Sequence, residues 1–300
     1  MGIVTLVQAS PALLFTFTTV LGLVVGSFLN VVIYRMPIML QRDWRAQCHE
    51  FLDLKNKEPD TNAATAKFKV FNLQKPDSHC PLCNHKIRAW ENIPVISYVF
   101  LLRGKCSSCK TKISIRYPTV ETATGILSAL VAASFGATWL TLAVLVLVWC
   151  LISLTLIDFD HQLLPDDITI PLLWLGLAVN AADLGMQVSI TDAVIGAIAG
   201  YLVFWSFFWL FKLLTGKEGM GYGDFKLLAA LGAWMGWQSL LPIVILSSLV
   251  GAVVGLGMIL IMGRDKSVPM PFGPYLAGAG YLMLIWGPQI NRFYFSTFVN

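Results

Sequence analysis

Two aspartates stand at the ends of long apolar runs and could work together as an acid and a base. Asp158 closes one run, in Leu156–Asp160, and Asp224 lies in Gly221–Lys226 at the edge of another. Two neighbouring carboxyl groups can share one proton, so that the ionised one accepts a proton from water while the protonated one polarises a carbonyl group. The pair therefore predicts an aspartyl hydrolase, provided that two helices deliver both groups to the same depth.

The Gly-x-Gly-Asp sequence around Asp224 is short, and a structural role competes with the catalytic one. Aspartate is a good N-cap, so Asp224 could simply begin a helix that starts near Leu227. Gly221 and Gly223 allow backbone conformations and close approaches that a side chain would prevent, which suits an extended peptide lying against the turn. The residues are equally consistent with both roles, and a helix cap does not exclude catalysis.

Other polar residues near Asp158 are rivals for the partner role. Asp166 or Asp167 is expected to cap the next helix. Asp160 suits a loop acid or a group that supports the site, and His161, alone in a polar loop, is expected to be solvated. Asp158 is preferred because it directly ends the apolar run.

Two CxxC pairs offer a second kind of chemistry, metal binding. They are Cys80, Cys83, Cys106 and Cys109. Four thiolates in this pattern predict a tetrahedral structural zinc site, and the alternative is a set of redox-active or incidental thiols. His79 and His85 flank the first pair, but four cysteines already complete the coordination shell, so both are expected outside it. Cys48 and Cys150 stand alone and are expected to be free thiols.

The elements that must carry these residues are membrane helices, so the expected fold class is an all-α polytopic membrane protein. Of the 300 residues, 56% are hydrophobic and 13% charged, and the mean hydropathy is +0.70. Apolar runs of about 20 residues span ~30 Å of hydrocarbon as a helix. Eight spans are expected, at Pro11–Tyr34, 118–136, 138–157, 169–185, 191–211, 227–237, 240–262 and 272–288. The first is too long to be the apolar part of a cleaved signal peptide.

The distribution of the basic residues predicts which side of the membrane each loop faces. Of 21 Lys and Arg, all but Arg292 fall in loops on one side, and most lie between Arg35 and Arg116. Positively charged loops stay in the cytoplasm, so both termini are expected outside and the basic loops inside. Disulfides are disfavoured in that compartment, which supports zinc. The net charge of +4 is explained by this topology and by contact with anionic membrane lipid, so it does not indicate nucleic acid.

Three parts follow from this topology. A first membrane helix is expected at 1–34, a cytoplasmic domain with both CxxC pairs at 35–116, and a membrane bundle at 117–300. Residues 41–78 are polar and are expected to form a mobile insertion. Residues 90–102 are too short to cross a bilayer and too apolar for a free loop, so they are expected to pack on the membrane surface or against the cysteine loops.

In combination, these motifs resemble the bacterial type IV prepilin peptidases, which are bifunctional leader peptidases and N-methyltransferases of the GxGD aspartyl protease group. The resemblance covers nearly the whole chain. It rests on both CxxC pairs and on the segments Gly26–Pro37, Glu91–Pro94, Arg103–Cys106, Asp158–Asp166 and Gly221–Lys226. Each motif is short, and their order and combination are specific.

The resemblance implies that Asp158 and Asp224 remove a short basic leader from prepilins and pseudopilins at the cytoplasmic face of the bacterial inner membrane. It also implies that the same protein methylates the new N-terminal amine with S-adenosylmethionine. No glycine-rich nucleotide-binding unit is visible, so the methyl-transfer site comes from the resemblance alone. Its candidate residues are Asn30, Arg35, Gly104 and Lys105. Simpler roles compete here, since Gly104 suits a turn and Arg35 a positively charged anchor at the membrane.

Two other classes of protein compete with this interpretation. In a proton-coupled transporter, Asp158 and Asp224 would relay protons, but transporters place such acids near the bilayer midplane within repeated halves. In a zinc-stabilised membrane scaffold, both acids would be helix caps. Glu121, inside the second expected span, is also costly to bury, and it is expected to pair with a basic residue such as Arg116 or to face an aqueous site.

Overall fold

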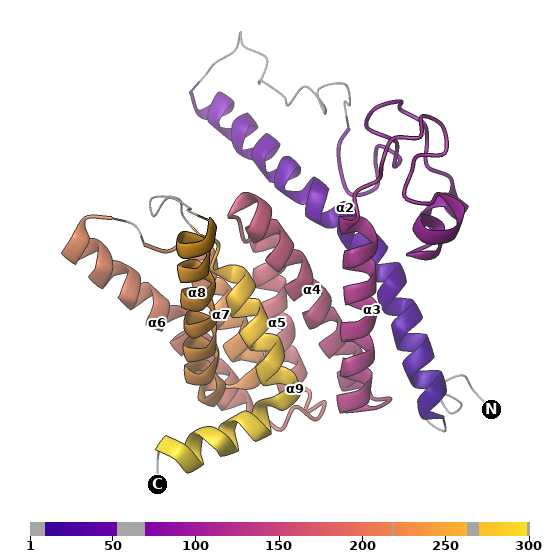
Figure 1. The fold of residues 1–300 in the computed structure, drawn as a ribbon. Coiled ribbons are helices and arrows are strands. Elements are labelled where there is room, and N and C mark those ends of the chain that lie inside the picture. The colour runs from indigo at the N-terminus through magenta and orange to yellow at the C-terminus, as the bar shows by residue number, and fades with distance from the viewer. Residues whose placement is uncertain (1–9, 53–69, 218, 263–269, 299–300) are drawn as a thin grey trace. The chain divides into compact units, whose positions relative to one another are not determined.

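The computed structural model describes residues 10–52, 70–217, 219–262 and 270–298, and the regular elements in these ranges are all helices (Figure 1). The chain divides into two compact units. One is Ser10–Leu130 and the other contains the described residues from Val131 onward. The candidate metal ligands belong to the first unit and both aspartates to the second, so each unit can be described by itself.

The first unit is built on a pair of long helices. Its elements are α2 (Pro11–Phe51), the short helical turns η1 (Ala89–Asn92) and η2 (Ser97–Leu101), and most of α3 (Arg116–Phe135). Where α2 and α3 cross, a Cβ atom added at Gly22 would lie 2.6 Å from Ser128 Oγ, and one added at Gly26 would lie 2.8 Å from Glu121 Cα. Small residues let membrane helices approach in this way. The crossing therefore places Glu121 at the level of Gly26.

The helix α2 is longer than the expected span. It continues past Tyr34 to Phe51, and Figure 1 shows it extending well beyond the end of α3. The expectation of a mobile insertion was therefore wrong for residues 41–51, while 53–69 lie outside the described residues. The apolar run ends near Tyr34, but the next residues are mainly good helix formers, so the helix continues as a polar one.

The second unit is a helical bundle around a short central helix. Its elements are α4 (Trp139–His161), α5 (Asp166–Ala181), α6 (Ile190–Thr215), α7 (Tyr222–Met235), η3 (Trp237–Ser239), α8 (Leu240–Met262) and α9 (Gly273–Phe298). Every residue of α7 from Leu227 to Met235 is buried. A Cβ atom added at Gly200 of α6 would lie 2.7 Å from the Leu228 carbonyl oxygen, and one added at Gly176 of α5 would lie 2.5 Å from the Trp234 ring. Glycines on the surrounding helices thus make room for α7.

Within the described residues, four helical segments are long and apolar enough to cross a membrane, as expected of a membrane protein. They are Pro11–Phe51, Trp139–His161, Ile190–Thr215 and Trp237–Ile261. The other expected spans also fall on helices, but α5 has 16 residues and α7 has 14. At 1.5 Å per residue, 14 residues rise about 21 Å, less than the ~30 Å of the hydrocarbon core. A helix that is surrounded by other helices does not have to be as long or as hydrophobic as a helix that faces lipid.

Candidate functional site

Asp158 lies in the last turn of α4, and its carboxyl group is held by the start of α9. Only 6% of the residue is exposed. The backbone N–H of Gly273, the first residue of α9, donates a hydrogen bond of 2.9 Å to Asp158 Oδ2. The helix α4 ends immediately beyond, where Gln162 adopts a left-handed conformation with φ of 54°. A buried carboxyl group is thus fixed by a backbone donor 115 residues away in the sequence.

Gly273 approaches Asp158 so closely that a side chain at this position would displace the carboxyl group. A Cβ atom added there would lie 2.7 Å from Asp158 Oδ2 and 3.2 Å from Leu164 Cδ2. Gly273 is a residue of the site that was not among the candidates expected from the sequence. A Gly-Pro pair after another proline is a recognisable signal for a helix start, but that signal does not reveal that a carboxyl group lies beside it.

Asp224 lies inside the first turn of α7. The helix begins at Tyr222 with Gly221 as its N-cap, and this cap makes no side-chain hydrogen bond. Of the two roles left open for Asp224, that of a cap for a helix starting near Leu227 does not apply, because the helix begins at Tyr222, five residues before the apolar run. Asp224 is 6% exposed, and its Oδ1 atom has no hydrogen-bond partner. Its other oxygen, Oδ2, lies beside Gly221.

The structure brings the two aspartates together. Leu164 lies against both Gly223, which precedes Asp224, and Gly273, which donates to Asp158. A Cβ atom added at Gly223, next to Asp224, would lie 2.6 Å from Leu164 Cβ, and Leu164 also lies against Gly273. The close neighbour of Gly223 is thus Leu164 of the same chain, whereas the expected neighbour was an extended peptide. Among the described contacts, no hydrogen bond joins the two carboxyl groups to each other.

The rival residues differ from this pair in exposure and in contacts. Asp160, His161, Asp166 and Asp167 are all exposed. The expectation that Asp166 or Asp167 caps α5 was wrong, since the N-cap is Pro165 and both acids lie in the first turn. Asp166 instead accepts hydrogen bonds of 2.7 Å from Lys226 Nζ on both of its oxygens. This ion pair ties the start of α5 to the first turn of α7, two residues from Asp224.

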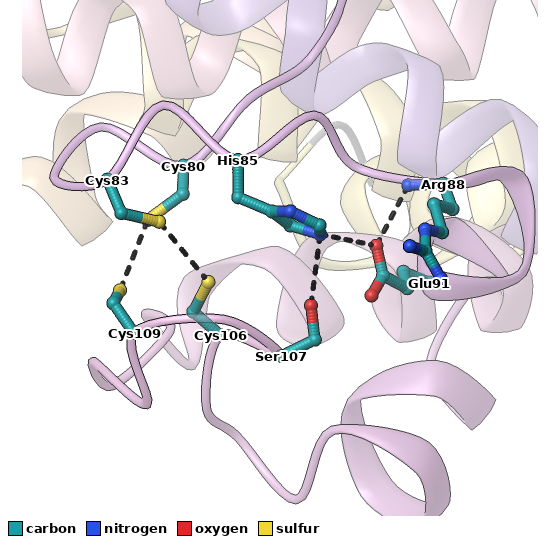
Figure 2. Close-up of polar contacts among 8 residues, drawn as sticks. All are labelled: Cys80, Cys83, His85, Arg88, Glu91, Cys106, Ser107 and Cys109. Carbon is teal, nitrogen blue, oxygen red and sulfur yellow. Dashed lines mark hydrogen bonds and ion pairs between the residues drawn. The ribbon is translucent and has the colours of Figure 1, made fainter.

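In the first unit the four cysteines of the CxxC pairs form one cluster (Figure 2). All four sulfur atoms lie within 4.8 Å of one another and none forms a disulfide. The Sγ atoms of Cys80 and Cys109 are 3.8 Å apart, and those of Cys83 and Cys106 are 3.9 Å apart. Four sulfurs at ~2.3 Å from a tetrahedral zinc ion would be about 3.8 Å apart. The cluster therefore fits a metal ion with tetrahedral thiolate coordination.

Both cysteine pairs fold into the same kind of loop. The Cys80 N–H donates to His85 O, and the Cys106 N–H donates to Thr111 O. The turn of each loop contains a non-glycine residue with positive φ, Asn84 at 55° and Lys110 at 60°. Two similar loops thus face each other, and each contributes two sulfur atoms.

The electrostatics of the cluster also favour a bound cation. Hydrogen bonds from the Thr111 side chain and backbone lower the pKa of Cys109 to about 6. At Cys83, the backbone of His85 lowers the pKa, but loss of hydration and the neighbouring thiols outweigh it and raise the pKa to about 11. Four adjacent sulfurs cannot all be charged without a counter-ion. A divalent cation removes this conflict because it binds thiolates.

His85 lies outside the sulfur cluster and connects it to η1 (Figure 2). His85 Nε2 is 3.1 Å from Ser107 Oγ and 3.4 Å from Glu91 Oε2. The Arg88 N–H donates to Glu91 Oε2 at 2.9 Å. This hydrogen bond, with smaller contributions from Ser107 and His85, holds the pKa of Glu91 below its ordinary value. Glu91 thus joins both cysteine loops to the segment that lies between them in the chain.

The candidates for methyl transfer in α2 make structural contacts. Arg35 is buried, and it donates hydrogen bonds to the carbonyl oxygens of Asn72, Leu73 and Pro76. Its guanidinium group also lies 5.7 Å from the centre of the Phe71 ring. These contacts fix the backbone of residues 70–78, which were expected to belong to a mobile insertion. Sequence analysis assigned Arg35 a positive charge at the membrane but could not reveal this role.

The remaining candidates lie on different segments of the same unit. Asn30 Nδ2 donates to the carbonyl oxygens of Gly26 and Tyr117 at 3.2 Å each. Gly104 has a φ of 70°, and a Cβ atom there would lie 3.2 Å from Tyr98 Oη, so the expected turn is present. Lys105 is exposed. Within the described contacts, no hydrogen bond links these candidates to one another or to Arg35.

The fold and the site define a helical membrane protein with two buried aspartates brought together in one bundle and a four-cysteine cluster in a separate unit. Comparison with known proteins gives the family. Residues 20–135 match the bacterial peptidase A24 N-terminal domain, and residues 145–256 match the type IV leader peptidase family. The chain belongs to the type IV leader peptidase family.

Relatives named prepilin leader peptidase/N-methyltransferase align along most of the chain. One from Stutzerimonas stutzeri is 58% identical over 92% of this chain and 91% of its own length. One from Pseudomonas aeruginosa is 55% identical over 95% of each chain, and one from Neisseria gonorrhoeae is 51% identical over 91% of each. No solved structure gave a significant match.

Proposed function

We propose that this protein is a bifunctional enzyme that cleaves the basic leader from type IV prepilins and pseudopilins and then methylates the new N-terminal amine. Family membership and the names of the relatives support both activities. The observation that carries the peptidase assignment is the convergence of Asp158 and Asp224, two buried carboxyl groups on separate helices whose surroundings share Leu164. Nothing in the comparisons favours the proton-coupled transporter.

In the proposed mechanism, Asp158 is the base and Asp224 the acid. The Gly273 N–H donates to Asp158, and a backbone donor at a helix N-terminus stabilises a carboxylate. Asp224 Oδ1 has no such donor and is available to carry a proton to the substrate. The single proton of the pair is therefore assigned to Asp224.

The proposed hydrolysis of the peptide bond begins with a proton transfer from water and ends with the release of an amine. Asp158 accepts a proton from water while the water oxygen bonds to the scissile carbonyl carbon, and Asp224 gives its proton to the carbonyl oxygen. The tetrahedral intermediate then loses the amine, as the carbon–nitrogen bond breaks and Asp158 passes its proton to the nitrogen. Asp224 recovers a proton from the hydroxyl group left on carbon. The products are a carboxylic acid and a free amine, and both aspartates return to their starting states.

The proposed topology has eight spans in the bacterial inner membrane, with both aspartates facing the cytoplasm. The asymmetry of the basic residues supports it, because nearly all of them fall in loops of one side. We retain the division into a first membrane helix at 1–34, a cytoplasmic domain at 35–116 and a membrane bundle at 117–300. In this arrangement a positively charged leader reaches the aspartates from the cytoplasm while the apolar part of the substrate stays in the lipid.

S-Adenosylmethionine is the proposed methyl donor, and it would supply the methyl group that the free amine accepts. Asn30, Arg35, Gly104 and Lys105 remain the proposed residues for this step. Asn30 and Arg35 hold the backbone of Tyr117 and of residues 72–76, so their proposed contribution is to position these segments. Lys105 is exposed and can contact an anionic group directly.

One assay tests both activities. Full-length protein in phospholipid nanodiscs would be incubated with a prepilin peptide and S-adenosylmethionine, and the products identified by mass spectrometry. We expect one cut after the basic leader and a gain of one methyl group on the new amine. An uncut peptide, together with a proton flux across proteoliposomes that contain the protein, would contradict the peptidase and support the transporter.

Zinc is the proposed occupant of the cysteine cluster, and its role is structural because four thiolates leave no open coordination position. We expect one zinc ion per chain by elemental analysis of the purified protein. Cys106→Ser is expected to lower the zinc content at least about tenfold and to expose residues 70–115 to protease. Cys48→Ser, which removes an exposed cysteine outside the cluster, is the matched control and should change neither. A full zinc content in Cys106→Ser would contradict the assignment.

A further inference from the structure

The segment 90–102 of the first unit exposes its apolar side chains and buries a polar one. Its large exposed residues are Trp90, Ile93, Ile96, Val99, Phe100 and Leu101. Phe100 is 73% exposed, whereas Ser97 is 6% exposed. A segment in contact with water shows the opposite pattern, and an apolar patch of this kind marks a surface for lipid or for another protein.

The segment is firmly attached to the cysteine loops, so its exposure does not come from a loose conformation. The Gly104 N–H donates to Tyr98 O at 2.9 Å. Tyr98 Oη donates to Ile113 O at 3.4 Å, and its ring covers Gly104. On the other side, Glu91 bonds the Arg88 amide and contacts His85 of the first cysteine loop. The apolar side chains therefore point away from a fixed base.

A buried carboxylate sets the depth of this segment relative to the membrane helices. The Val95 N–H donates a hydrogen bond of 2.7 Å to Glu121 Oε2 of α3. Val95 has a φ of 60°, which is unfavourable for a β-branched residue, so this bond holds a strained turn in place. Glu121 was expected to pair with a basic side chain such as Arg116 or to face an aqueous site, and the partners that the structure gives it are the Val95 N–H and the Ser27 side chain.

Glu121 itself lies beside the apolar part of a spanning helix. Gly26 of α2 packs directly against Glu121 Cα, and eight residues, or about 12 Å of helix, separate Gly26 from the end of the apolar run at Tyr34. The Val95 turn is tied to this depth, so the adjacent apolar side chains lie at the level of lipid rather than of the cytoplasm.

Cations flank the apolar side chains. Arg88, Arg103 and Lys105 are exposed at the two ends of the segment, and the Arg88 guanidinium group lies 5.4 Å from the centre of the Trp90 ring. Tryptophan and basic residues are typical of the boundary between hydrocarbon and headgroups. Basic residues at that level attract anionic phospholipids.

We propose that residues 90–102 form a membrane-interface segment, which inserts Ile96, Val99 and Phe100 among the acyl chains of an anionic bilayer. Arg88, Arg103 and Lys105 lie at the level of the headgroups. The occupant of the surface is lipid because both the depth set by Glu121 and the flanking charges match it. This proposal does not depend on the proposed enzymatic function.

The test measures how deeply Phe100 enters the bilayer. A spin label is attached through an unnatural amino acid at position 100 of the full-length protein, in nanodiscs of phosphatidylcholine and phosphatidylglycerol. Collisions with oxygen report lipid and collisions with a water-soluble nickel complex report water. Leu82, which is 70% exposed on the first cysteine loop, is the matched control.

We expect the label at position 100 to collide mainly with oxygen and the label at position 82 mainly with the nickel complex. The ratio of oxygen to nickel accessibility should differ at least about tenfold between the two positions. Equal ratios at the two positions would overturn the proposal. Protection of position 100 from both reagents would also overturn it and would identify a protein surface, either the other unit or a bound substrate. In pure phosphatidylcholine we expect a shallower position, and an unchanged depth would remove the role of the cations.

Variants of Glu121 test whether its carboxylate sets the depth. Glu121→Gln keeps an oxygen that accepts the Val95 N–H, so the label at position 100 should keep its depth. Glu121→Leu removes the acceptor, and the label should move toward water. The same depth in both variants would contradict the role of Glu121, and zinc content checks that each variant folds.

Discussion

Asp158→Asn and Asp224→Asn are each expected to lower the rate of leader cleavage by at least about 10³-fold, because each removes one half of a unit that acts together. Asparagine keeps the size of aspartate but can neither accept the proton from water nor give one to the carbonyl oxygen. Single-turnover kinetics on a prepilin peptide measure the effect. Asp160→Asn is the matched control, since this acid is exposed and only two residues from Asp158. It should cleave at nearly the wild-type rate.

The two variants should differ in how they bind substrate. In Asp224→Asn the new amide resembles the neutral acid that we assign to this position, so peptide affinity should stay close to that of the wild type. Asp158→Asn removes an anion that accepts the Gly273 N–H, so binding as well as cleavage should weaken. Methylation of a peptide that has already lost its leader should continue in both variants, which also shows that they are folded. Cleavage at the wild-type rate in either one would contradict the two-aspartate mechanism.

Gly273→Ala is expected to lower cleavage by about 10²-fold without removing any polar group, since a shift of about 1 Å in a reacting group can cost this much. The alanine keeps the N–H that donates to Asp158, but its Cβ atom would lie 2.7 Å from Asp158 Oδ2. The carboxyl group must therefore move. Single-turnover cleavage at saturating peptide measures the loss directly.

Gly278 provides a control for this variant within the same helix. A Cβ atom added at Gly278 meets nothing within 4 Å. Gly278→Ala therefore replaces a glycine of the same helix by alanine, as Gly273→Ala does, but does not displace Asp158. We expect it to cleave like the wild type. If Gly273→Ala and Gly278→Ala had the same activity, the position of Asp158 would not depend on the start of α9.

The sequence predicted the elements that carry the site better than the contacts within it. Asp158 and Asp224 could be chosen because they end apolar runs, and the four cysteines because of their spacing. The role of Gly273 could not be predicted, because nothing in a local pattern reveals which backbone amide lies beside a carboxylate 115 residues away. The hydrogen bond between Val95 and Glu121 could not be predicted for the same reason, since it joins a loop to a helix.

The limits of helices were the weaker part of the prediction. Hydropathy predicts which part of a helix can lie in lipid, whereas helix propensity and capping residues determine where the helix begins and ends. These two properties diverge at α2, which continues to Phe51, and at α7, which begins at Tyr222 before its apolar run. The second difference changes the role of Asp224, because Gly221 is the cap and the Asp224 carboxyl group keeps an oxygen, Oδ1, without a hydrogen-bond partner.

The pairing of two similar cysteine loops has an entropic consequence for the chain between them. A metal held by both loops closes residues 84–105 into a ring, and closing about 22 flexible residues costs about 3 kcal/mol of chain entropy. The free energy of metal binding offsets this loss of entropy, so the hydrogen bond from Val95 to Glu121 does not have to order the whole ring. It only has to orient a ring that is already closed. Loss of the metal would therefore loosen the membrane-interface segment even though none of its residues is a ligand.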